Sequence, residues 1–229
     1  TLAPAQDHKR IFDSDLGRNT GGMGAYAPAP VVSHALMDRV RREIIRPTLQ
    51  GMAADGHSYR GCLYVGIMIT ETGPNVIEYN CPPAHPETQA ILPLLDADIV
   101  PLLLDAATGT MHREFPLKPY AAVCVVIAAG GYPDRYETGH QILGLKEAEG
   151  EDNVMVFHGG TKELHGAVVT AGGRVLGVTA LGNRDDLEGT VDAAYRAVEK
   201  ITFDGMYYRS DIGKKGILRA KQSTRTENT

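Results

Sequence analysis

Three glycines within four positions stand near the start of this sequence, beside residues that could bind a ligand. The run is Asn19-Thr20-Gly21-Gly22-Met23-Gly24-Ala25-Tyr26. Glycine tolerates positive φ and lets backbone N–H groups approach a ligand closely. A polar block, Gln6-Asp7-His8-Lys9-Arg10, lies upstream and is followed by Asp13 and Asp15. These two cations and three acids favour a polar ligand that is anionic or zwitterionic.

A second candidate site lies at the end of an expected strand, Val76–Asn80. Residues two apart face the same side of a strand, so Glu78 and Asn80 point together. Carboxylate and amide oxygens are hard ligands that suit Mg²⁺ or Mn²⁺. Taken alone, such a pair is more often a solvated strand end. The glycine-rich loop elsewhere in the chain gives the metal interpretation more weight.

Hydrophobic periodicity indicates the elements that position these residues. Residues 1–30 are expected to be loop with short extended pieces. Apolar residues at helical spacing predict a helix from Ser33 that ends near Arg46, because Pro47 breaks it, followed by a short second turn. A Gly-Pro-Asn turn separates two strands and predicts a hairpin. The expected elements of this half are strands 59–70 and 76–80 and helices 86–94 and 96–106.

The pattern changes near residue 115, where we place a domain boundary. Short β-rich runs separated by glycine turns follow it, with one helix over Leu187–Ile201 that Asp185 and Glu188 are expected to cap. Tyr207-Tyr208-Arg209 is expected at a sheet edge, where Arg209 either stacks on tyrosine or contacts a ligand. The basic residues 214–229 are expected to be disordered. The expected strands of this half are 121–129, 154–158, 167–170 and 174–179.

The composition excludes several function classes. With 229 residues, 43% hydrophobic and 22% charged, the sequence is typical of a soluble globular protein. Its net charge of −5 does not favour binding to nucleic acid, and only the basic tail has the positive charge that such binding requires. No apolar stretch reaches about 18 residues, so no membrane span is expected. Three scattered cysteines fit a reducing, cytoplasmic setting. The abrupt start at Thr1, without Met and beside the candidate active-site loop, predicts a fragment of something longer.

Several motifs together resemble one family, glycinamide ribonucleotide synthetase, also called phosphoribosylamine–glycine ligase. They run in the family's order through nearly the whole chain, and their combination is specific. The motifs are Asp7-His8-Lys9-Arg10, the run 19–26, Glu78-Tyr79-Asn80-Cys81, Pro86-Glu87-Thr88-Gln89-Ala90, Gly130-Gly131-Tyr132-Pro133, Gly172-Gly173-Arg174-Val175-Leu176 and Phe203-Asp204-Gly205-Met206-Tyr207-Tyr208-Arg209.

The resemblance implies an ATP-dependent ligase of purine biosynthesis that joins glycine to 5-phosphoribosylamine through glycyl phosphate. It implies an α+β fold: the C-terminal part of an ATP-grasp domain (1–115, antiparallel sheet with helices), then a small β-rich domain with one helix (116–213) and the tail. The partners it implies are ATP, glycine, phosphoribosylamine and a missing N-terminal half of the same enzyme. The implied site residues are Lys9, Arg10 and Asn19 (catalytic), Asp7, Asp15, Thr20, Gly21, Gly22, Met23, Gly24 and Arg174 (substrate-binding), and Glu78 and Asn80 (Mg²⁺ or Mn²⁺).

The sequence departs from the family pattern in two segments. Where the family has Arg-Phe-Gly-Asp, this chain has Pro82-Pro83-Ala84-His85, so a cation that could bind phosphate is absent. In the segment 13–19, Ser14 and Arg18 replace a glycine and a proline of the family. Two alternatives therefore stay open: a non-catalytic or degenerate homologue that binds metal or ligand weakly, and another ATP-grasp ligase such as a carboxylase subunit or peptide ligase.

Overall fold

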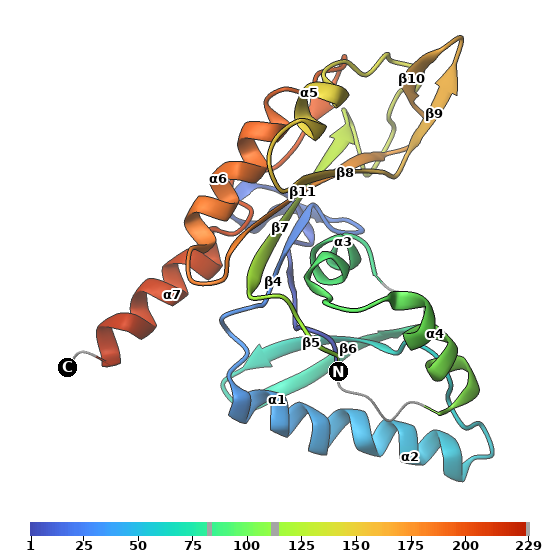
Figure 1. The fold of residues 1–229 in the computed structure, drawn as a ribbon, viewed down its shortest axis with the longest axis vertical. Coiled ribbons are helices and arrows are strands. Elements are labelled where there is room, and N and C mark those ends of the chain that lie inside the picture. Colours follow the sequence, from blue (N-terminus) through green and yellow to red (C-terminus); the bar gives the residue numbers. More distant parts are fainter. Residues whose placement is uncertain (82–83, 111–114, 228–229) are drawn as a thin grey trace. The chain divides into compact units, whose positions relative to one another are not determined.

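The structure is a computed structural model that describes residues 1–81, 84–110 and 115–227. Its elements form two compact units that interleave along the chain (Figure 1). The sheet unit consists of Leu2–Ala29, His85–Leu94 and Leu117–Thr229. The hairpin unit consists of Pro30–Ala84 and Leu95–Pro116, with Thr1. Both units combine helices with antiparallel strand pairs, which is an α+β arrangement.

The sheet unit is built on six strands in the order β1-β4-β7-β11-β8, with β12 also pairing with β7. Two of them, β7 and β11, are the longest and pair along most of their length. The short strand β4 lies on the other side of β7, where Ala25 is opposite Cys124. The bounds are β1 Gln6–Asp7, β4 Gly24–Ala27, β7 Tyr120–Ala129, β8 Val154–His158, β11 Arg174–Asn183 and β12 Met206–Tyr207.

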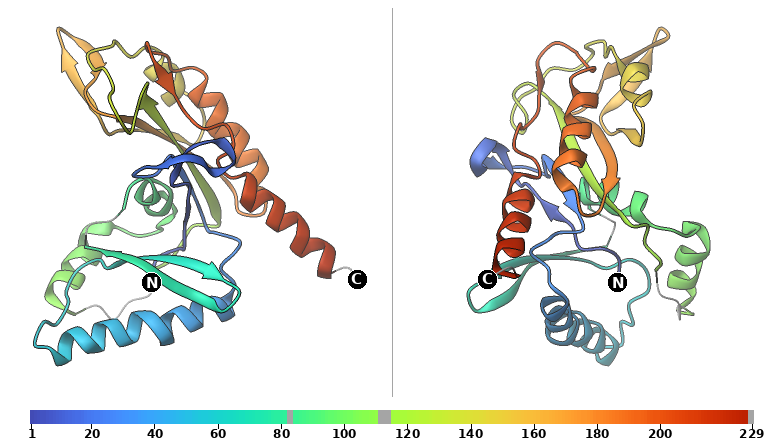
Figure 2. Two further views of the ribbon diagram at one scale, coloured as in Figure 1. Left: turned by 180° about the vertical axis from the view of Figure 1, so that it is seen from behind. Right: turned by 60° about the vertical axis from the view of Figure 1, so that its left-hand side comes forward.

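Strand β7 is buried on both of its faces, which explains its continuous apolar sequence. Its odd-numbered residues, such as Val123 and Val125, belong to the main core with Val191 and Ala194. The last two residues are from helix α6, Leu187–Val198, which runs along the sheet (Figure 2). Its even-numbered residues Ala122 and Cys124 belong to a second cluster with Ala25, Ala27, Ala90 and Leu94. The core therefore holds β4 in place from both sides of the sheet.

The remaining elements of the sheet unit surround this core. Strands β2 (Arg10–Phe12) and β3 (Leu16–Asn19) form a small hairpin around the 3₁₀ turn η1 (Asp13–Asp15). A second hairpin pairs β9 with β10. The other bounds are α3 Glu87–Ile91, η3 Leu92–Leu94, α5 Leu145–Glu149, β9 Thr161–Leu164, β10 Ala167–Thr170 and α7 Lys214–Glu227.

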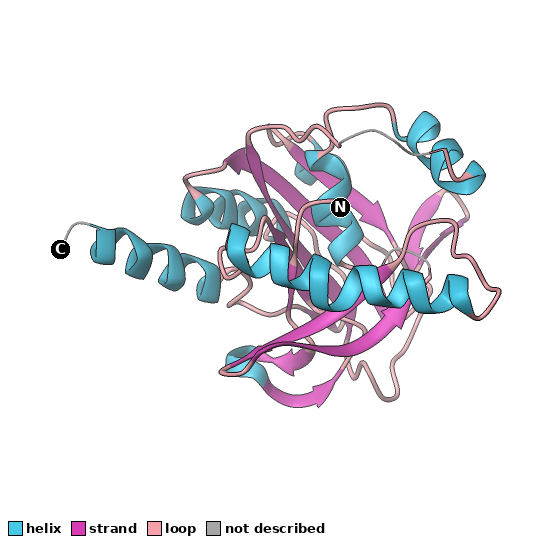
Figure 3. Cartoon of the chain, turned by 90° about the horizontal axis from the view of Figure 1, so that it is seen from below, coloured by secondary structure: helices cyan, strands magenta, loops and turns pink. Residues whose placement is uncertain are grey.

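In the hairpin unit, one helix runs without a break from His34 to Ala54 (Figure 3), as α1 (His34–Val40), the π-helical turn η2 (Arg41–Ile45) and α2 (Arg46–Ala54). The prediction that Pro47 ends the helix is wrong. A π-helical turn just before Pro47 widens the helix locally. Pro47 lies in the first turn of α2. The Thr48 hydroxyl donates to the Ile44 carbonyl at 2.7 Å and so supplies a hydrogen bond in this turn.

The predicted hairpin is present in the same unit as β5 (Tyr64–Thr70) and β6 (Gly73–Asn80). Its register shifts between Gly66 and Ile67, so one extra residue of β6 is accommodated. Helix α4 covers Ile99–Thr108, and the Asp98 carboxylate caps it by accepting from the Val100 N–H at 2.9 Å. Among the described residues no helix is both long enough and apolar enough to cross a lipid bilayer.

Two predictions about the C-terminal part need correction. The segment expected to be disordered contains helix α7, because Ile212 is buried and Ile217 packs against the main core. The close approach of Gly216 to Leu187 and Tyr26 shows how tightly the first turns are seated. The cap of α6 is Asp186, which accepts from the Gly189 N–H, and not Asp185. The domain boundary near residue 115 stays a prediction.

Candidate active site

The glycine-rich loop joins β3 to β4, and its backbone N–H groups bind to the protein itself. Gly21 donates to the Tyr132 hydroxyl at 3.1 Å, Gly22 to the Thr20 hydroxyl at 3.0 Å, and Met23 to the His8 carbonyl at 2.9 Å. The idea that these amides meet a ligand therefore gains no support from the structure. Substrate binding by Thr20, Gly21, Gly22, Met23 and Gly24 stays a prediction.

Glycine is required at position 22 by both conformation and space. Its φ is +107°, where side chains are strained. A Cβ atom on Gly22 would lie 2.3 Å from Pro86 Cδ and 2.8 Å from Asp7 Oδ1. The loop therefore packs directly on the residue before α3 and on the carboxylate that ends β1.

Asp7, Lys9 and Glu87 form a charged cluster beside this loop. Lys9 Nζ lies 2.6 Å from Asp7 Oδ2 and 3.8 Å from Glu87 Oε1. The two carboxylates are almost buried, whereas the Lys9 side chain is 42% exposed. Asp7 and Lys9 are among the residues expected from the sequence, whereas Glu87 is not. The position of Glu87 within the family motif 86–90 could have indicated its role.

The buried carboxylates change the acidity of Asp7. Burial and, to a smaller extent, the negative charge of Glu87 raise the pKa of Asp7, Lys9 lowers it, and the net pKa is about 6. A carboxylate that titrates near neutral pH is suited to accept a proton or to bind an ammonium group. The cluster therefore has the chemistry that a ligand with an amine requires.

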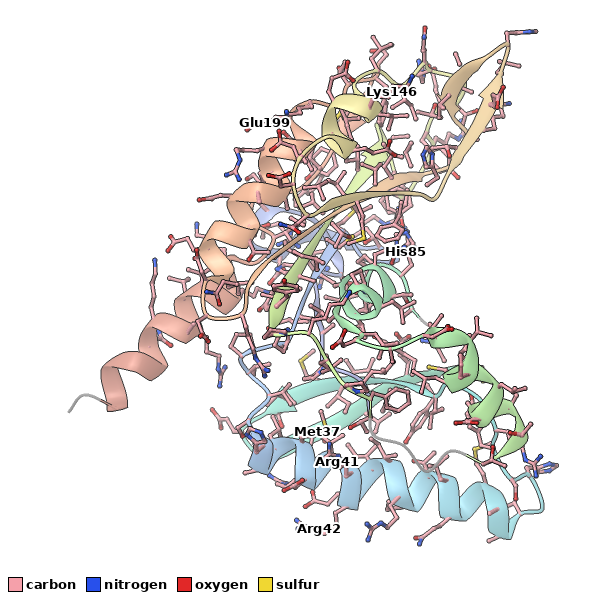
Figure 4. All side chains as sticks on the ribbon, in the orientation of Figure 1. Met37, Arg41, Arg42, His85, Lys146 and Glu199 are labelled. Atoms are coloured by element: carbon pink, nitrogen blue, oxygen red, sulfur yellow. The ribbon has the colours of Figure 1, made fainter. Side chains whose placement is uncertain are left out.

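Arg174 links the loop to the segment before α3. Its Nη1 donates to the carbonyls of Gly21 and His85, the latter at 2.8 Å, and lies 3.2 Å from His85 Nδ1. His85 is labelled in Figure 4. Burial and the charge of Arg174 lower the pKa of His85 to about 4, so its ring is a neutral acceptor at pH 7. His85 thus provides a partner for Arg174 in the segment that departs from the family pattern; Pro82 and Pro83 of that segment lie outside the described residues.

Thr20 donates to the Lys9 carbonyl, whereas Asp15, Arg10 and Asn19 have other neighbours. Asp15 is paired with Arg209 and Lys215. The Arg10 guanidinium donates to the Gly17 carbonyl at 2.6 Å, and Asn19 is exposed opposite Arg10 in the β2–β3 hairpin. The structure thus brings together Asp7, Lys9, Gly21, Gly22 and Arg174, and adds Glu87 and His85.

Glu78 and Asn80 belong to the hairpin unit, where they lie on one face of β6. They are opposite Gly66 and Tyr64 of β5, on the same side of the register shift. A Cβ atom on Gly66 would lie 2.8 Å from Glu78 Cγ, so the glycine leaves room for the glutamate stem. One exposed carboxylate and one half-buried amide fit a divalent cation that keeps water and phosphate oxygens as further ligands. No group of three or more His, Cys, Asp or Glu residues within 1–81, 84–110 and 115–227 could hold a metal alone.

His8 predicts a pH dependence of stability. It is 1% exposed, Nδ1 contacts the Gly24 carbonyl at 3.2 Å, and burial followed by the charges of Arg209 and Lys215 lowers its pKa from 6.5 to about 4. The unfolded chain therefore binds this proton more readily, so stability falls as pH drops from 6.5 to 4, by up to roughly 3 kcal/mol. His85 acts in the same direction and Asp7 opposes it.

Urea unfolding between pH 4 and 7 measures this effect. His8→Asn keeps a donor near the Nδ1 position but does not titrate, so its stability should fall less steeply at low pH than that of the unmodified chain. The exposed His57→Asn is the control and should retain the original slope. Parallel pH profiles for His8→Asn and the unmodified chain would contradict the prediction.

Comparison with known proteins gives consistent matches. The family model for the phosphoribosylglycinamide synthetase ATP-grasp (A) domain matches residues 1–88, and that for the C domain of the same enzyme matches residues 122–215. Phosphoribosylamine–glycine ligase of Synechocystis sp. is 52% identical over 219 residues, 94% of this chain and 52% of the relative. The chain thus spans about half the length of the curated relatives it matches.

Solved structures agree with the sequence matches. The crystal structure of phosphoribosylamine–glycine ligase from Thermotoga maritima has a TM-score of 0.81 and 36% identity, over 92% of this chain and 51% of that one. The biotin carboxylase domain of Hydrogenobacter thermophilus 2-oxoglutarate carboxylase has a TM-score of 0.56 at 17% identity, over 84% of this chain and 41% of that one, which shows likeness of fold alone. The expected fold class, the C-terminal part of an α+β ATP-grasp fold, is confirmed.

Proposed function

We propose that this chain, which belongs to the phosphoribosylglycinamide synthetase family, forms the C-terminal half of a ligase that joins glycine to 5-phosphoribosylamine. One observation carries the proposal: the family similarity runs through both groups of candidate residues. The match over residues 1–88 contains the charged cluster members Asp7 and Lys9, the loop 19–26, and Glu78 with Asn80, and the match over 122–215 contains Arg174. The remaining half of the same enzyme is the proposed partner.

In the proposed reaction, the glycine carboxylate first takes the γ-phosphoryl group of ATP and becomes glycyl phosphate, and ADP is the leaving group. The amine of phosphoribosylamine then attacks the acyl carbon, the amide bond forms, and inorganic phosphate leaves. Glu78 and Asn80 would hold Mg²⁺ or Mn²⁺, which supplies positive charge that neutralises phosphate oxygens. ATP is the co-substrate, and cytoplasmic location remains a prediction.

The charged cluster has two roles in this proposal. The Lys9 ammonium, partly exposed beside the loop, donates to the oxygen that gains negative charge when the acyl carbon is attacked. The attacking amine must lose a proton as the amide forms, and Asp7, whose pKa is raised to about 6, accepts it. Glu87 keeps Asp7 basic through like charge. Arg10, Asn19 and Arg174 keep their predicted roles as catalytic and substrate-binding candidates.

A degenerate, non-catalytic homologue has less support. The cluster of Asp7, Lys9 and Glu87 is complete, and His85 gives Arg174 two acceptors despite the changed segment. A carboxylase or peptide ligase is also less supported, because solved carboxylase domains resemble the chain only in fold. The comparisons with ligases of the proposed specificity extend over more than nine-tenths of the chain.

Phosphate release from ATP by the complete polypeptide tests the proposal. We expect release only when glycine and phosphoribosylamine are both present, and a product that contains both. Release with other carboxylates, or with neither substrate, would contradict the assigned specificity. A variant with Arg-Phe-Gly-Asp at positions 82–85 shows whether the native segment limits the rate. For the isolated chain we expect little or no heat of ATP binding in calorimetry, since the family resemblance places the ATP-covering lobe in the other half.

A further inference from the structure

Arg209 is completely buried, and the proposed reaction does not use it directly. Its Nε and Nη2 donate to the two oxygens of Asp211 at 2.7 and 2.8 Å. Its Nη1 donates to Asp15 Oδ1 at 3.2 Å and to the Arg10 carbonyl at 3.0 Å. A buried guanidinium is tolerated when its donors are satisfied in this way. Two of these partners, Arg10 and Asp15, belong to the β2–β3 hairpin.

Neighbours of Arg209 bind the same hairpin. We call the segment Tyr207–Lys215 the C-terminal clamp. Each contact joins this segment to residues 11–15, far away in sequence. The contacts are Tyr207 hydroxyl to Ile11 carbonyl (2.9 Å), Ser210 N–H to Asp13 Oδ1 (2.9 Å), Ser210 hydroxyl to Asp13 Oδ2, Ser14 N–H to Asp211 Oδ2 (2.8 Å), Lys215 to Asp15, and the edge-on packing of Phe12 and Tyr207.

Ile11 is the one apolar residue of the β2–β3 hairpin that is buried among the described residues; it is 4% exposed and packs with Met23 and Ala128. All four residues of β3 are exposed, and Phe12 and Leu16 are 52% and 63% exposed. Ser14 and Asp15 adopt φ of 58° and 55°, a region that side chains disfavour. Both strained residues are bound by the clamp, Ser14 through its N–H and Asp15 through its carboxylate. Polar contacts with the clamp therefore hold the turn of this hairpin, while Ile11 anchors its first strand in the apolar cluster.

The hairpin in turn sets the position of predicted catalytic residues. Lys9 directly precedes β2, and its carbonyl accepts from the Thr20 N–H at 2.7 Å, just after β3. Arg10 and Asn19 are opposite each other in the hairpin itself. We infer that Arg209 is a positioning residue: through the C-terminal clamp it holds the β2–β3 hairpin so that Lys9 and the glycine-rich loop keep the geometry that ligation needs. The catalytic part of this inference rests on the proposed function.

Arg209→Met in the complete ligase tests the inference. Because the hairpin loses its buried anchor, we expect kcat to fall about 10- to 100-fold while KM for ATP stays within about twofold. Hydrogen exchange of the amides in residues 10–19 should become at least about tenfold faster, with the amides of β7 and β11 still protected. Arg209→Lys should be intermediate, since lysine can pair with Asp211 but lacks the fork that also reaches Asp15. The control is Lys200→Met, which removes the exposed Lys200–Glu151 pair of the same unit and should change none of these readouts.

The possible results separate the two proposals. Unchanged exchange of residues 10–19 in folded Arg209→Met, or a fall in kcat no larger than in Lys200→Met, would overturn the inference. If Arg209→Met does not fold, Asp15→Asn decides, because it removes the ion pairs of Asp15 with Arg209 and Lys215 and keeps the Arg209–Asp211 pair; it should make exchange of residues 10–19 faster. If the complete polypeptide shows no ligation at all, the proposed function fails, while the exchange measurements still decide whether the clamp holds the hairpin.

Discussion

Replacing Glu78 with alanine in the complete ligase is expected to lower kcat by about 1000-fold or more. A divalent cation contributes several kcal/mol to stabilising phosphoryl and acyl transfer, and each 1.4 kcal/mol corresponds to about tenfold in rate. Glu78 is the one carboxylate of the proposed pair, and Asn80 alone supplies a neutral oxygen. Because Glu78 is exposed on β6, the melting temperature of the variant should remain close to that of the unmodified enzyme. Initial rates titrated with Mg²⁺ and Mn²⁺ measure the effect.

Glu71 provides a matched control for Glu78. It is an exposed carboxylate in the turn of the same β5–β6 hairpin, so Glu71→Ala removes the same charge without removing a proposed ligand. We expect Glu71→Ala to keep its rate and its metal dependence. Turnover of Glu78→Ala at the rate of the unmodified enzyme would refute the metal assignment. Partial recovery of Glu78→Ala at high Mn²⁺ would support it, since a weakened site fills at higher concentration.

Replacing Gly22 with alanine should have the second large effect, on stability and activity together. The left-handed φ of +107° and the 2.3 Å distance from the new Cβ to Pro86 Cδ each raise the free energy of the folded state. We expect the free energy of unfolding to fall by about 2–4 kcal/mol from strain and overpacking combined. Since the same Cβ would meet Asp7 Oδ1 at 2.8 Å, the charged cluster must also shift. Urea unfolding and steady-state rates measure the two consequences.

Gly139→Ala separates strain from packing. Gly139 also has a left-handed φ, +92°, but a Cβ there would meet no atom within 4 Å. This variant should therefore lose only the strain part, about 1–2 kcal/mol, and should keep its catalytic rate. Equal losses of stability in Gly22→Ala and Gly139→Ala would show that the loop does not press on Pro86 and Asp7.

Much of the fold was predictable from the sequence, because long apolar patterns dominate it. Strand β7 and helix α6 lie within a few residues of their predicted ranges, since their periodicity reflects burial directly. The helix through Pro47 was mispredicted because a π-helical turn precedes the proline. Such a turn depends on local hydrogen bonding, which hydrophobic periodicity does not reveal. Helix α7 was mispredicted as disordered because its sequence is basic and few of its residues are apolar. Ile217 nevertheless packs against the main core.

The candidate site was predictable only in part. Asp7, Lys9 and the glycines stand out by type and spacing in the sequence. Glu87 and His85 contribute through contacts with residues far away along the chain, and local patterns do not encode such contacts. Arg209 was expected either to stack on tyrosine or to contact a ligand. It is instead a buried cation that pairs with Asp211 and Asp15, and its surroundings come from residues far away in the sequence.

The pairing of β4 with β7 determines when the central sheet can form during synthesis of the chain. In the order of synthesis β1 and β4 precede residues 30–116, whereas β7, which pairs with β4, and then β11 follow these residues. Pairing between segments so distant in sequence forms slowly, because a long loop must close before any contact repays it. The glycine-rich loop of a nascent chain therefore lacks its contacts with β7 and Arg174 until those residues have been synthesised, and the chain is exposed to aggregation during that interval.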